Sequence, residues 1–319
     1  MHLLIPSLFC PPASLTDPAQ VQAPGLQRLL DRARPLPGVE GYFPQLLQLV
    51  GQPLDTPAAP IALLGEGLIP GDGIWMQASP VHLRADLANL LLFADRDLPI
   101  QTTEAESLCT AFNAHFGGQG LVLTAPHAQR WYLRLNTMPR LRTWPLEQVV
   151  GGSPQPFLPQ GADAHHWRAL LTETQMLFHG QELNQQRQMQ GLPAINGLWL
   201  HGAGRLPRPA PCPISALMGE DLLARGVQRW LGLGQGAETA GDGELRLFLA
   251  LAQARSAAHW LEALQRLEAW LEPHLAWLQA DRQRRLRLYD GGGRGLECSP
   301  RQGLRLWPRP RPFGHYLRQ

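Results

Sequence analysis

The sequence contains no lysine, so arginine supplies all 28 basic residues. This absence excludes three kinds of chemistry. A lysine that holds nucleotide phosphates, a lysine that forms a Schiff base and a lysine general base are all impossible in this chain. We attribute the absence itself to the base composition of the genome rather than to function.

Cysteine is also scarce, and no long apolar run is present. Cys10, Cys109, Cys212 and Cys298 lie far apart and form no Cys-x-x-Cys pair, which argues against a zinc ribbon or a thioredoxin-type site. No apolar run approaches the roughly 20 residues of a membrane helix. The first residues, MHLLIPSLF, lack a cationic leader and predict a strand rather than a signal peptide. We therefore expect reduced cysteines, no membrane association and a cytoplasmic location.

The 319 residues are 44% hydrophobic and 17% charged, with a net charge of +2, which predicts a sizeable core and no particular partner. A chain of this length forms either one large α/β domain or two coupled domains.

Hydrophobic periodicity and turn residues predict the following elements. Strands are expected at 2–9, 87–95 and 244–251, in the strand-rich stretch 61–81, as a hairpin or neighbouring strands at 120–125 and 130–135, and as a hairpin at 285–300. Helices are expected at 25–33, 102–116, from Asp163 onward, within 214–232, and along the apolar positions from Trp260 to Leu278, with a kink or break at Pro273.

These elements predict a domain organisation. Residues 1–60 and 163–300 are expected to form an α/β core, 61–150 an α+β subdomain, and 301–319 a tail rich in arginine and aromatics.

One turn has the composition of a phosphate-binding loop. Residues 195–207 read INGLWLHGAGRLP, an apolar strand that ends in His201 and a Gly-x-Gly pair, Gly202 and Gly204. Such a turn can bring backbone N–H groups to an anion when a helix follows. Here Arg205 and a run of alternating prolines follow, which cannot open a helix. The turn is therefore better explained by a backbone that requires positive φ.

Other chemical motifs are weak. His165 and His166 are adjacent on a predicted helix and point about 100° apart, so they make poor joint ligands. His179 and His201 have no partner at metal-ligand spacing, and no Gly-x-Ser-x-Gly motif is present. The sequence predicts neither a metal site nor a catalytic residue.

The C-terminal region is strongly basic. Residues 280–319 contain ten arginines and three acids, a net charge of +7. Arginine interleaved with aromatics can bind phosphate backbones and stack on bases. The candidates for contact with nucleic acid or an acidic partner are Arg285, Arg287, Arg305, Trp307, Arg309 and Arg311. The alternative is a solvated hairpin followed by a strap that packs on the body of the protein.

Four blocks carry a family resemblance: SPVHLRADLANLLLFAD (79–95), RWYLRL (130–135), TETQMLFHGQELNQQRQMQGLPAINGLWLHGAG (172–204) and the Arg/Trp tail. They resemble the RpfE-type regulatory protein family of proteobacteria, whose members are often described as phosphoglycerate-mutase-like. The resemblance implies a role in regulating exported virulence factors, and it implies no specific catalytic activity.

Part of the same region, about 70–235, is similar to the archaeal-type cofactor-independent phosphoglycerate mutases. INGLWLHGAG followed by ISALMGEDLLARG carries that similarity, and Arg84 corresponds loosely to a substrate-facing arginine. The similarity implies an α/β fold: a mixed sheet core with helices, related to the alkaline-phosphatase/phosphoglycerate mutase architecture, with an α+β insertion. Those enzymes hold two metals with Asp and His ligands. Here the first strand runs into Pro6 and Ser7 with no acid.

We therefore expect a non-catalytic regulatory or protein-binding factor with an unidentified protein partner and no cofactor. The residues expected near an anionic metabolite are Arg84, Asn196, His201, Gly202, Gly204 and Arg205. Two alternatives remain: a mutase-like phosphoryl-transfer enzyme with relocated ligands, and a nucleic-acid accessory protein that uses the arginine-rich tail.

Overall fold

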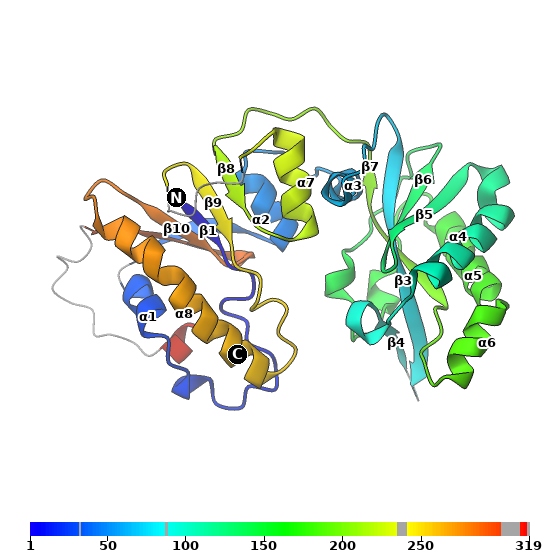
Figure 1. Ribbon diagram of the computed structural model, residues 1–319, viewed down its shortest axis with the longest axis horizontal. Helices are drawn as coiled ribbons and strands as arrows, with labels where there is room; N and C mark the ends of the chain where they lie inside the picture. The colour runs from blue at the N-terminus through cyan, green and yellow to red at the C-terminus, as the bar shows by residue number, and fades with distance from the viewer. Residues whose placement is uncertain (32, 87–88, 235–240, 301–312, 318–319) are drawn as a thin grey trace. The chain divides into compact units, whose positions relative to one another are not determined.

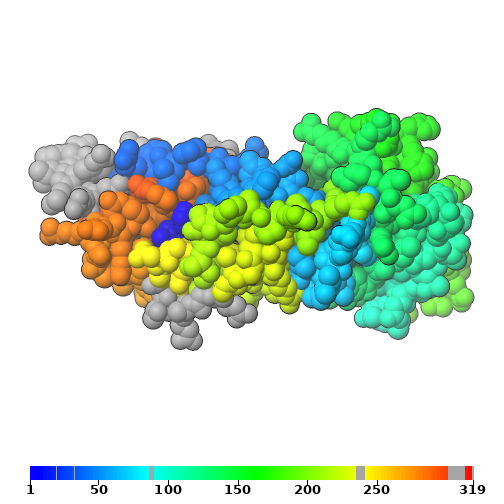
Figure 2. Space-filling model, turned by 90° about the horizontal axis from the view of Figure 1, so that it is seen from above, coloured from blue at the N-terminus to red at the C-terminus, as the bar shows by residue number. Residues whose placement is uncertain are grey.

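The computed structural model describes residues 1–31, 33–86, 89–234, 241–300 and 313–317. The chain divides into two compact units, one formed by Met1–Thr56 with Pro209–Gln319 and the other by Pro57–Arg208. The second unit spans the light blue to yellow-green part of the colour scale in the space-filling view (Figure 2).

The first unit is built on a six-stranded mixed sheet in the order β2-β11-β10-β1-β9-β8 (Figure 1). Its strands are β1 (His2–Leu4), β2 (Arg34–Glu40), β8 (Ala216–Met218), β9 (Glu244–Leu247), β10 (Leu286–Tyr289) and β11 (Gly292–Cys298). β10, β1, β9 and β8 run parallel to one another, and β11 pairs antiparallel with both β10 and β2. This is the mixed sheet expected of the α/β core.

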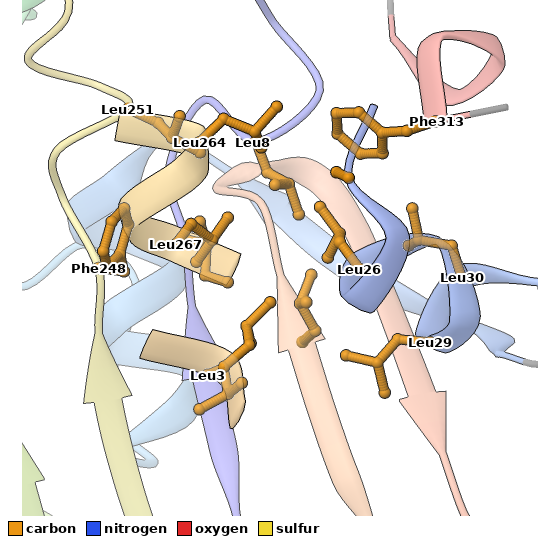
Figure 3. Close-up of a cluster of buried hydrophobic side chains, with 14 of the residues drawn as sticks. Leu3, Leu8, Leu26, Leu29, Leu30, Phe248, Leu251, Leu264, Leu267 and Phe313 are labelled. Carbon is orange, nitrogen blue, oxygen red and sulfur yellow. The ribbon is translucent and has the colours of Figure 1, made fainter. Parts of the chain in front are cut away.

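Two helices cover one face of this sheet. α1 (Pro24–Leu30) and α8 (Ala257–Gln279) bury leucines such as Leu26 and Leu267 against Leu3 of the sheet (Figure 3). The row of buried side chains on α8 continues past Pro273 to Leu278. The expected break at that proline is therefore wrong, and one helix spans the whole segment. The other helices of this unit are α2 (Tyr42–Leu49) and α7 (Leu222–Leu231).

A carboxylate joins α1 to α8. The N–H groups of Gly25 and Leu26, in the first turn of α1, donate to the two oxygens of Glu268 at 2.7 Å each. These N–H groups have no partner within the helix. They lie at the positive end of the helix dipole, which favours a negative charge. Glu268 therefore stabilises the start of α1 from a position 242 residues away in the chain.

The second unit contains a five-stranded antiparallel sheet built around β3 (Ile74–Asp86). β3 pairs with β6 (Arg130–Leu135) over its first residues, with β7 (Gly197–Gly204) through its middle, and with β4 (Asn89–Phe93) at its end. β5 (Leu121–His127) completes the sheet as the hairpin partner of β6. The helices of this unit are α3 (Ala58–Glu66), α4 (Thr102–Phe116), α5 (Ala164–His179) and α6 (Glu182–Met189).

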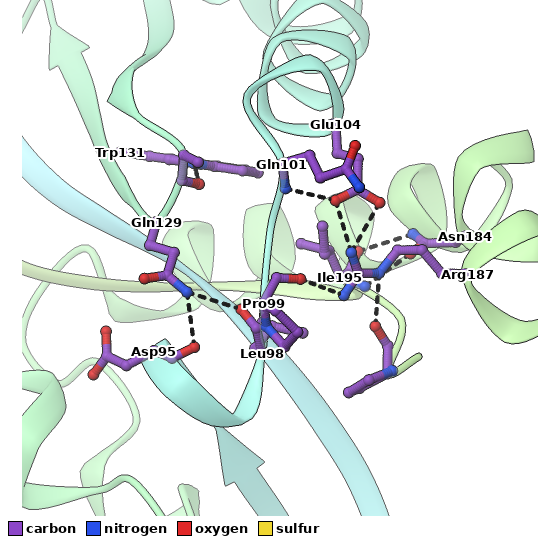
Figure 4. Close-up of polar contacts among 12 residues, drawn as sticks. Asp95, Leu98, Pro99, Gln101, Glu104, Gln129, Trp131, Asn184, Arg187 and Ile195 are labelled. Atoms are coloured by element: carbon purple, nitrogen blue, oxygen red, sulfur yellow. Dashed lines mark hydrogen bonds and ion pairs between the residues drawn. The ribbon is translucent and has the colours of Figure 1, made fainter. Parts of the chain in front are cut away.

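A buried arginine ties α4 to α6. The Arg187 side chain is 2% exposed and donates to both oxygens of Glu104 at 2.8 Å and to the carbonyls of Pro99 and Pro193 (Figure 4). Glu104 also accepts from the N–H of Gln101 and so completes the cap of α4. Every charge buried here has a hydrogen-bonded partner, and the network fixes the segment that leads into β7.

Five elements differ from the expectation. α5, α6 and β7, which we expected in the core, belong to the second unit because β7 pairs with β3. The start of the strand-rich stretch 61–81 is the helix α3, which is buried on nearly all sides and so shows no helical period. β2 was missed because it contains Pro35 and Pro37, which a strand tolerates only at a sheet edge.

Within the described residues, no helix has the combination of length and apolar character that a bilayer crossing requires. All four cysteines are free.

We predict that Glu268→Ala lowers the free energy of unfolding by about 1–2 kcal/mol, because it removes two hydrogen bonds to the start of α1. Denaturant unfolding of the full chain measures the change. Glu262→Ala is the matched control, since Glu262 is exposed on the same helix, and its effect should stay within about 0.5 kcal/mol. Equal effects of the two substitutions would show that the cap contributes nothing.

Candidate functional site

The Gly-x-Gly turn lies at the end of β7, in a β-bulge against β3. Gly204 is opposite Trp75 and His201 is opposite Gln77, so residues 202–203 face a single residue of β3. Gly202 has φ +67°, in the left-handed region that favours glycine. The positive φ expected from the sequence is therefore present at Gly202.

The bulge packs directly against the start of α3. A Cβ atom on Gly204 would lie 2.5 Å from Cβ of Pro57, and one on Gly202 would lie 3.0 Å from Cβ of Ala58. Both glycines are thus required by close approach of two backbone segments. The space beside the first residues of α3, where an anion would meet free N–H groups, is occupied by the chain itself.

Asn196 is used by the sheet. The N–H of Leu83 donates to its Oδ1 at 2.7 Å, and its Nδ2 donates to the Leu83 carbonyl at 2.9 Å. The side chain therefore replaces a backbone partner of β3 just before β7 begins. This contact satisfies one donor and one acceptor of the amide.

The two arginines expected beside the turn lie apart from each other. The Arg205 guanidinium donates to the Asp72 carbonyl, while the Arg84 guanidinium lies 4.7 Å from the centre of the Phe93 ring. Arg84 and Trp75 are nine positions apart on β3, which corresponds to roughly 30 Å of extended strand. Arg84 therefore does not join the other expected residues around a common point.

His201 is buried, with 6% of its surface exposed. Burial lowers the pKa of its imidazole to about 4, because desolvation penalises the charged ring. The side chain is therefore neutral near pH 7. A neutral, enclosed imidazole cannot supply a positive charge to an anionic ligand.

A different set of residues gathers at the carboxyl ends of the parallel strands in the first unit. Open α/β sheets bind ligands at this edge. Pro6 and Ser7 follow β1, Asp290 follows β10, and Asp221 follows β8. Ser7 has φ +62°, an uncommon conformation for a residue other than glycine, and its N–H donates to the Asp290 carbonyl at 3.2 Å.

Asp221 is engaged through both of its oxygens. Oδ1 accepts from the N–H groups of Leu223 and Ala224 and caps α7, and Oδ2 accepts from the Tyr42 hydroxyl at 2.6 Å. Burial, and then the Asp221 charge, raise the pKa of Tyr42 well above its usual value, so the phenol stays protonated as the donor. The pair therefore joins the starts of α2 and α7.

Asp290 is the most deeply buried acid at this edge, with 2% of its surface exposed. Its Oδ1 accepts from the N–H groups of Gly292 at 2.7 Å and Arg294 at 2.9 Å, which holds the β10–β11 turn. Its Oδ2 is buried and makes no hydrogen bond to the described part of the chain. This oxygen is the free acidic group that a cation or a proton donor could use.

A metal would need more than this one oxygen. Across the residues that the structure describes, no three His, Cys, Asp or Glu side chains lie close enough together to hold a metal ion. Our sequence analysis did not single out Tyr42, Asp221 or Asp290. The Tyr-Asp-Gly-Gly-Gly turn after an alternating strand was the one local signal for Asp290. The contact between Tyr42 and Asp221 could not be seen in the sequence, because the two residues are 179 positions apart.

Two of the C-terminal arginines have partners within the first unit. The Arg285 guanidinium donates to the carbonyls of Gln283 and Arg284, and Nε of Arg287 donates to Glu297 at 2.9 Å. Arg305, Trp307, Arg309 and Arg311 lie outside the described residues. Beyond them, Phe313 is fully buried in the core beside α1 (Figure 3). At least this part of the tail packs on the body, as the alternative interpretation expected.

Comparisons with known proteins identify a similar fold. The chain is similar to the PH0037 protein from Pyrococcus horikoshii, with a TM-score of 0.55 and 15% identity over 93% of this chain and 87% of that one. It is also similar to a cofactor-independent phosphoglycerate mutase from Thermoplasma acidophilum DSM 1728, with a TM-score of 0.43 and 15% identity over 93% and 88% of the two chains. No family model and no curated protein matches the sequence. The likeness to PH0037 shows the fold alone.

Proposed function

We propose that this protein is a cytoplasmic, non-catalytic regulatory or protein-binding factor with a phosphoglycerate-mutase-like fold, of the RpfE type. The observation that carries the proposal is the full engagement of Asp221 at the carboxyl edge of the parallel sheet. A carboxylate that caps a helix and accepts from the hydroxyl of a half-buried tyrosine holds the fold together. Both of its oxygens are held in these hydrogen bonds, so a bound cation would disturb the cap of α7 and the contact with Tyr42.

The glycine turn supports the same proposal. Gly202 and Gly204 are explained by their contact with Pro57 and Ala58, and Asn196 by its bonds to β3. These motif residues, shared in order with the family that the sequence resembles, are thus accounted for by packing and strand pairing. Their retention does not require a bound phosphate.

A phosphoryl-transfer enzyme remains the second candidate, because one observation favours it. Asp290 has a buried, unpartnered oxygen, and the Ser7 hydroxyl lies on the adjacent strand end. An acid and a hydroxyl at this edge are two of the groups that metal-assisted phosphoryl transfer uses. The two candidates make opposite predictions about activity and about Asp290.

We predict that the full chain, supplied with Mn²⁺ or Mg²⁺, neither interconverts 2- and 3-phosphoglycerate nor hydrolyses p-nitrophenyl phosphate above the level of Asp290→Asn. Elemental analysis of the protein purified without chelator should find less than one divalent metal ion per chain. A steady-state assay with both variants measures the first quantity. Metal-dependent turnover that is lost in Asp290→Asn and in Ser7→Ala would refute the non-catalytic proposal.

A structural role for His201 predicts a specific pH dependence. Its pKa in the folded state, about 4, lies below the ordinary value of 6.5, so the unfolded chain binds the proton more readily. The native state therefore loses stability as pH falls below 6.5, by about 2 kcal/mol between pH 7 and pH 5. His201→Gln should remove this part of the slope in denaturant unfolding measured across that range.

His179→Gln is the matched control, because His179 is exposed on α5. It should leave the slope of the wild-type protein unchanged. A His201→Gln variant whose stability falls with pH as steeply as the wild type would mean that the imidazole of His201 is not held neutral by burial.

A further inference from the structure

The second unit contains a pocket that none of the preceding observations uses. It lies between the strand pair β3 and β7 and the helix α5, and its volume is about 210 Å³. Leu83, Leu198 and Trp199 line it from the strands, and Arg168, Leu171 and Gln175 line it from the helix. Arg168 is exposed, so the pocket reaches the protein surface.

The walls of the pocket are apolar. Trp199 is 4% exposed, and its Nε1 donates to the Trp144 carbonyl at 2.8 Å, so its polar atom already has a partner. The indole ring is thereby fixed as an apolar surface. Leu83, Leu171 and Leu198 add three aliphatic side chains. Such walls favour a ligand with an apolar body over a sugar or a nucleotide.

The only charged side chain in the described lining of the pocket is on α5, together with Thr172 and Gln175, while Gln155 contributes a further amide from the segment before α5. Nε of Arg168 donates to the Pro159 carbonyl at 3.0 Å, which orients the guanidinium. The two Nη groups of Arg168 make no hydrogen bond to the described residues and can pair with a carboxylate. The described lining contains no Asp or Glu, so a positive charge at the mouth is not neutralised within the pocket.

We propose that this pocket binds a small monocarboxylate with an apolar body, its carboxylate paired with Arg168 and its body against Trp199 and the leucines. The inference goes beyond the proposed regulatory or protein-binding function, since it names a small-molecule ligand. A dry cavity of about 150 Å³ holds benzene, so 210 Å³ corresponds to a ligand of roughly eight to ten non-hydrogen atoms. Phenylacetate has this size and charge, and octanoate is its chain-like counterpart.

Isothermal titration of the full chain with phenylacetate and with octanoate tests the proposal, with 2-phenylacetamide as the neutral analogue. We expect a Kd on the order of 0.1–1 mM for at least one acid and binding of the amide at least about tenfold weaker. The acid that binds more tightly shows whether the apolar part of the ligand is a ring or a chain.

Two variants and one control locate the site. Arg168→Met should weaken acid binding by about tenfold or more and leave the amide unchanged, since it removes the charge and keeps the apolar stem. Arg134→Met is the control, because Arg134 is exposed on β6 and does not line the pocket. Thr172→Trp, at another exposed lining position, should fill the pocket and abolish binding of all three compounds.

Equal affinity for acid and amide, equal effects of Arg168→Met and Arg134→Met, or no binding at 5 mM would overturn this inference. The result is separable from the test of the proposed function. Metal-dependent turnover of phosphoesters would refute the non-catalytic proposal whether or not the pocket binds an acid. If neither turnover nor acid binding is found, the monocarboxylate inference fails and the non-catalytic proposal stands.

Discussion

A carboxylate removed from water needs hydrogen-bond donors, and three carboxylates of this protein find them at the starts of helices. Glu268 takes the first N–H groups of α1, Asp221 takes those of α7, and Glu104 completes the cap of α4. Each acid also connects its helix to a distant part of the same unit: α8, Tyr42 and Arg187 respectively. In both units, a contact of this kind helps to place helices: α1 and α7 in the first unit and α4 in the second.

The same contact limits where an anion can bind. A helix start attracts phosphate because its N–H groups lack partners. At α1, α4 and α7 the protein's own carboxylates supply the partners, and the start of α3 is covered by the glycine bulge of β7. In the pocket of the second unit, the positive charge in the described lining is a side chain, Arg168, rather than a helix terminus. This is why the ligand that the structure favours is an apolar acid rather than a phosphate ester.

Much of the fold could be predicted from the sequence, because strong periodicity marked α4, α8 and the β5–β6 hairpin. The missed elements were those without a period: α3, which is buried on nearly all sides, and β2, whose prolines disguise an edge strand. The positive φ of Gly202 was predictable from residue type. The Tyr42–Asp221 contact was not, since its partners are 179 residues apart and the block ISALMGEDLLARG that contains Asp221 carries no signal for Tyr42.

The prolines of β2 have one more consequence. Pro35 and Pro37 are two positions apart, so their backbone nitrogens point to the same edge of the strand. β2 pairs with β11 along its other edge. The open side therefore lacks two of the donors that an incoming strand would need. Copies of this chain cannot readily extend the sheet edge to edge at β2, which lowers the risk that the first unit templates its own aggregation.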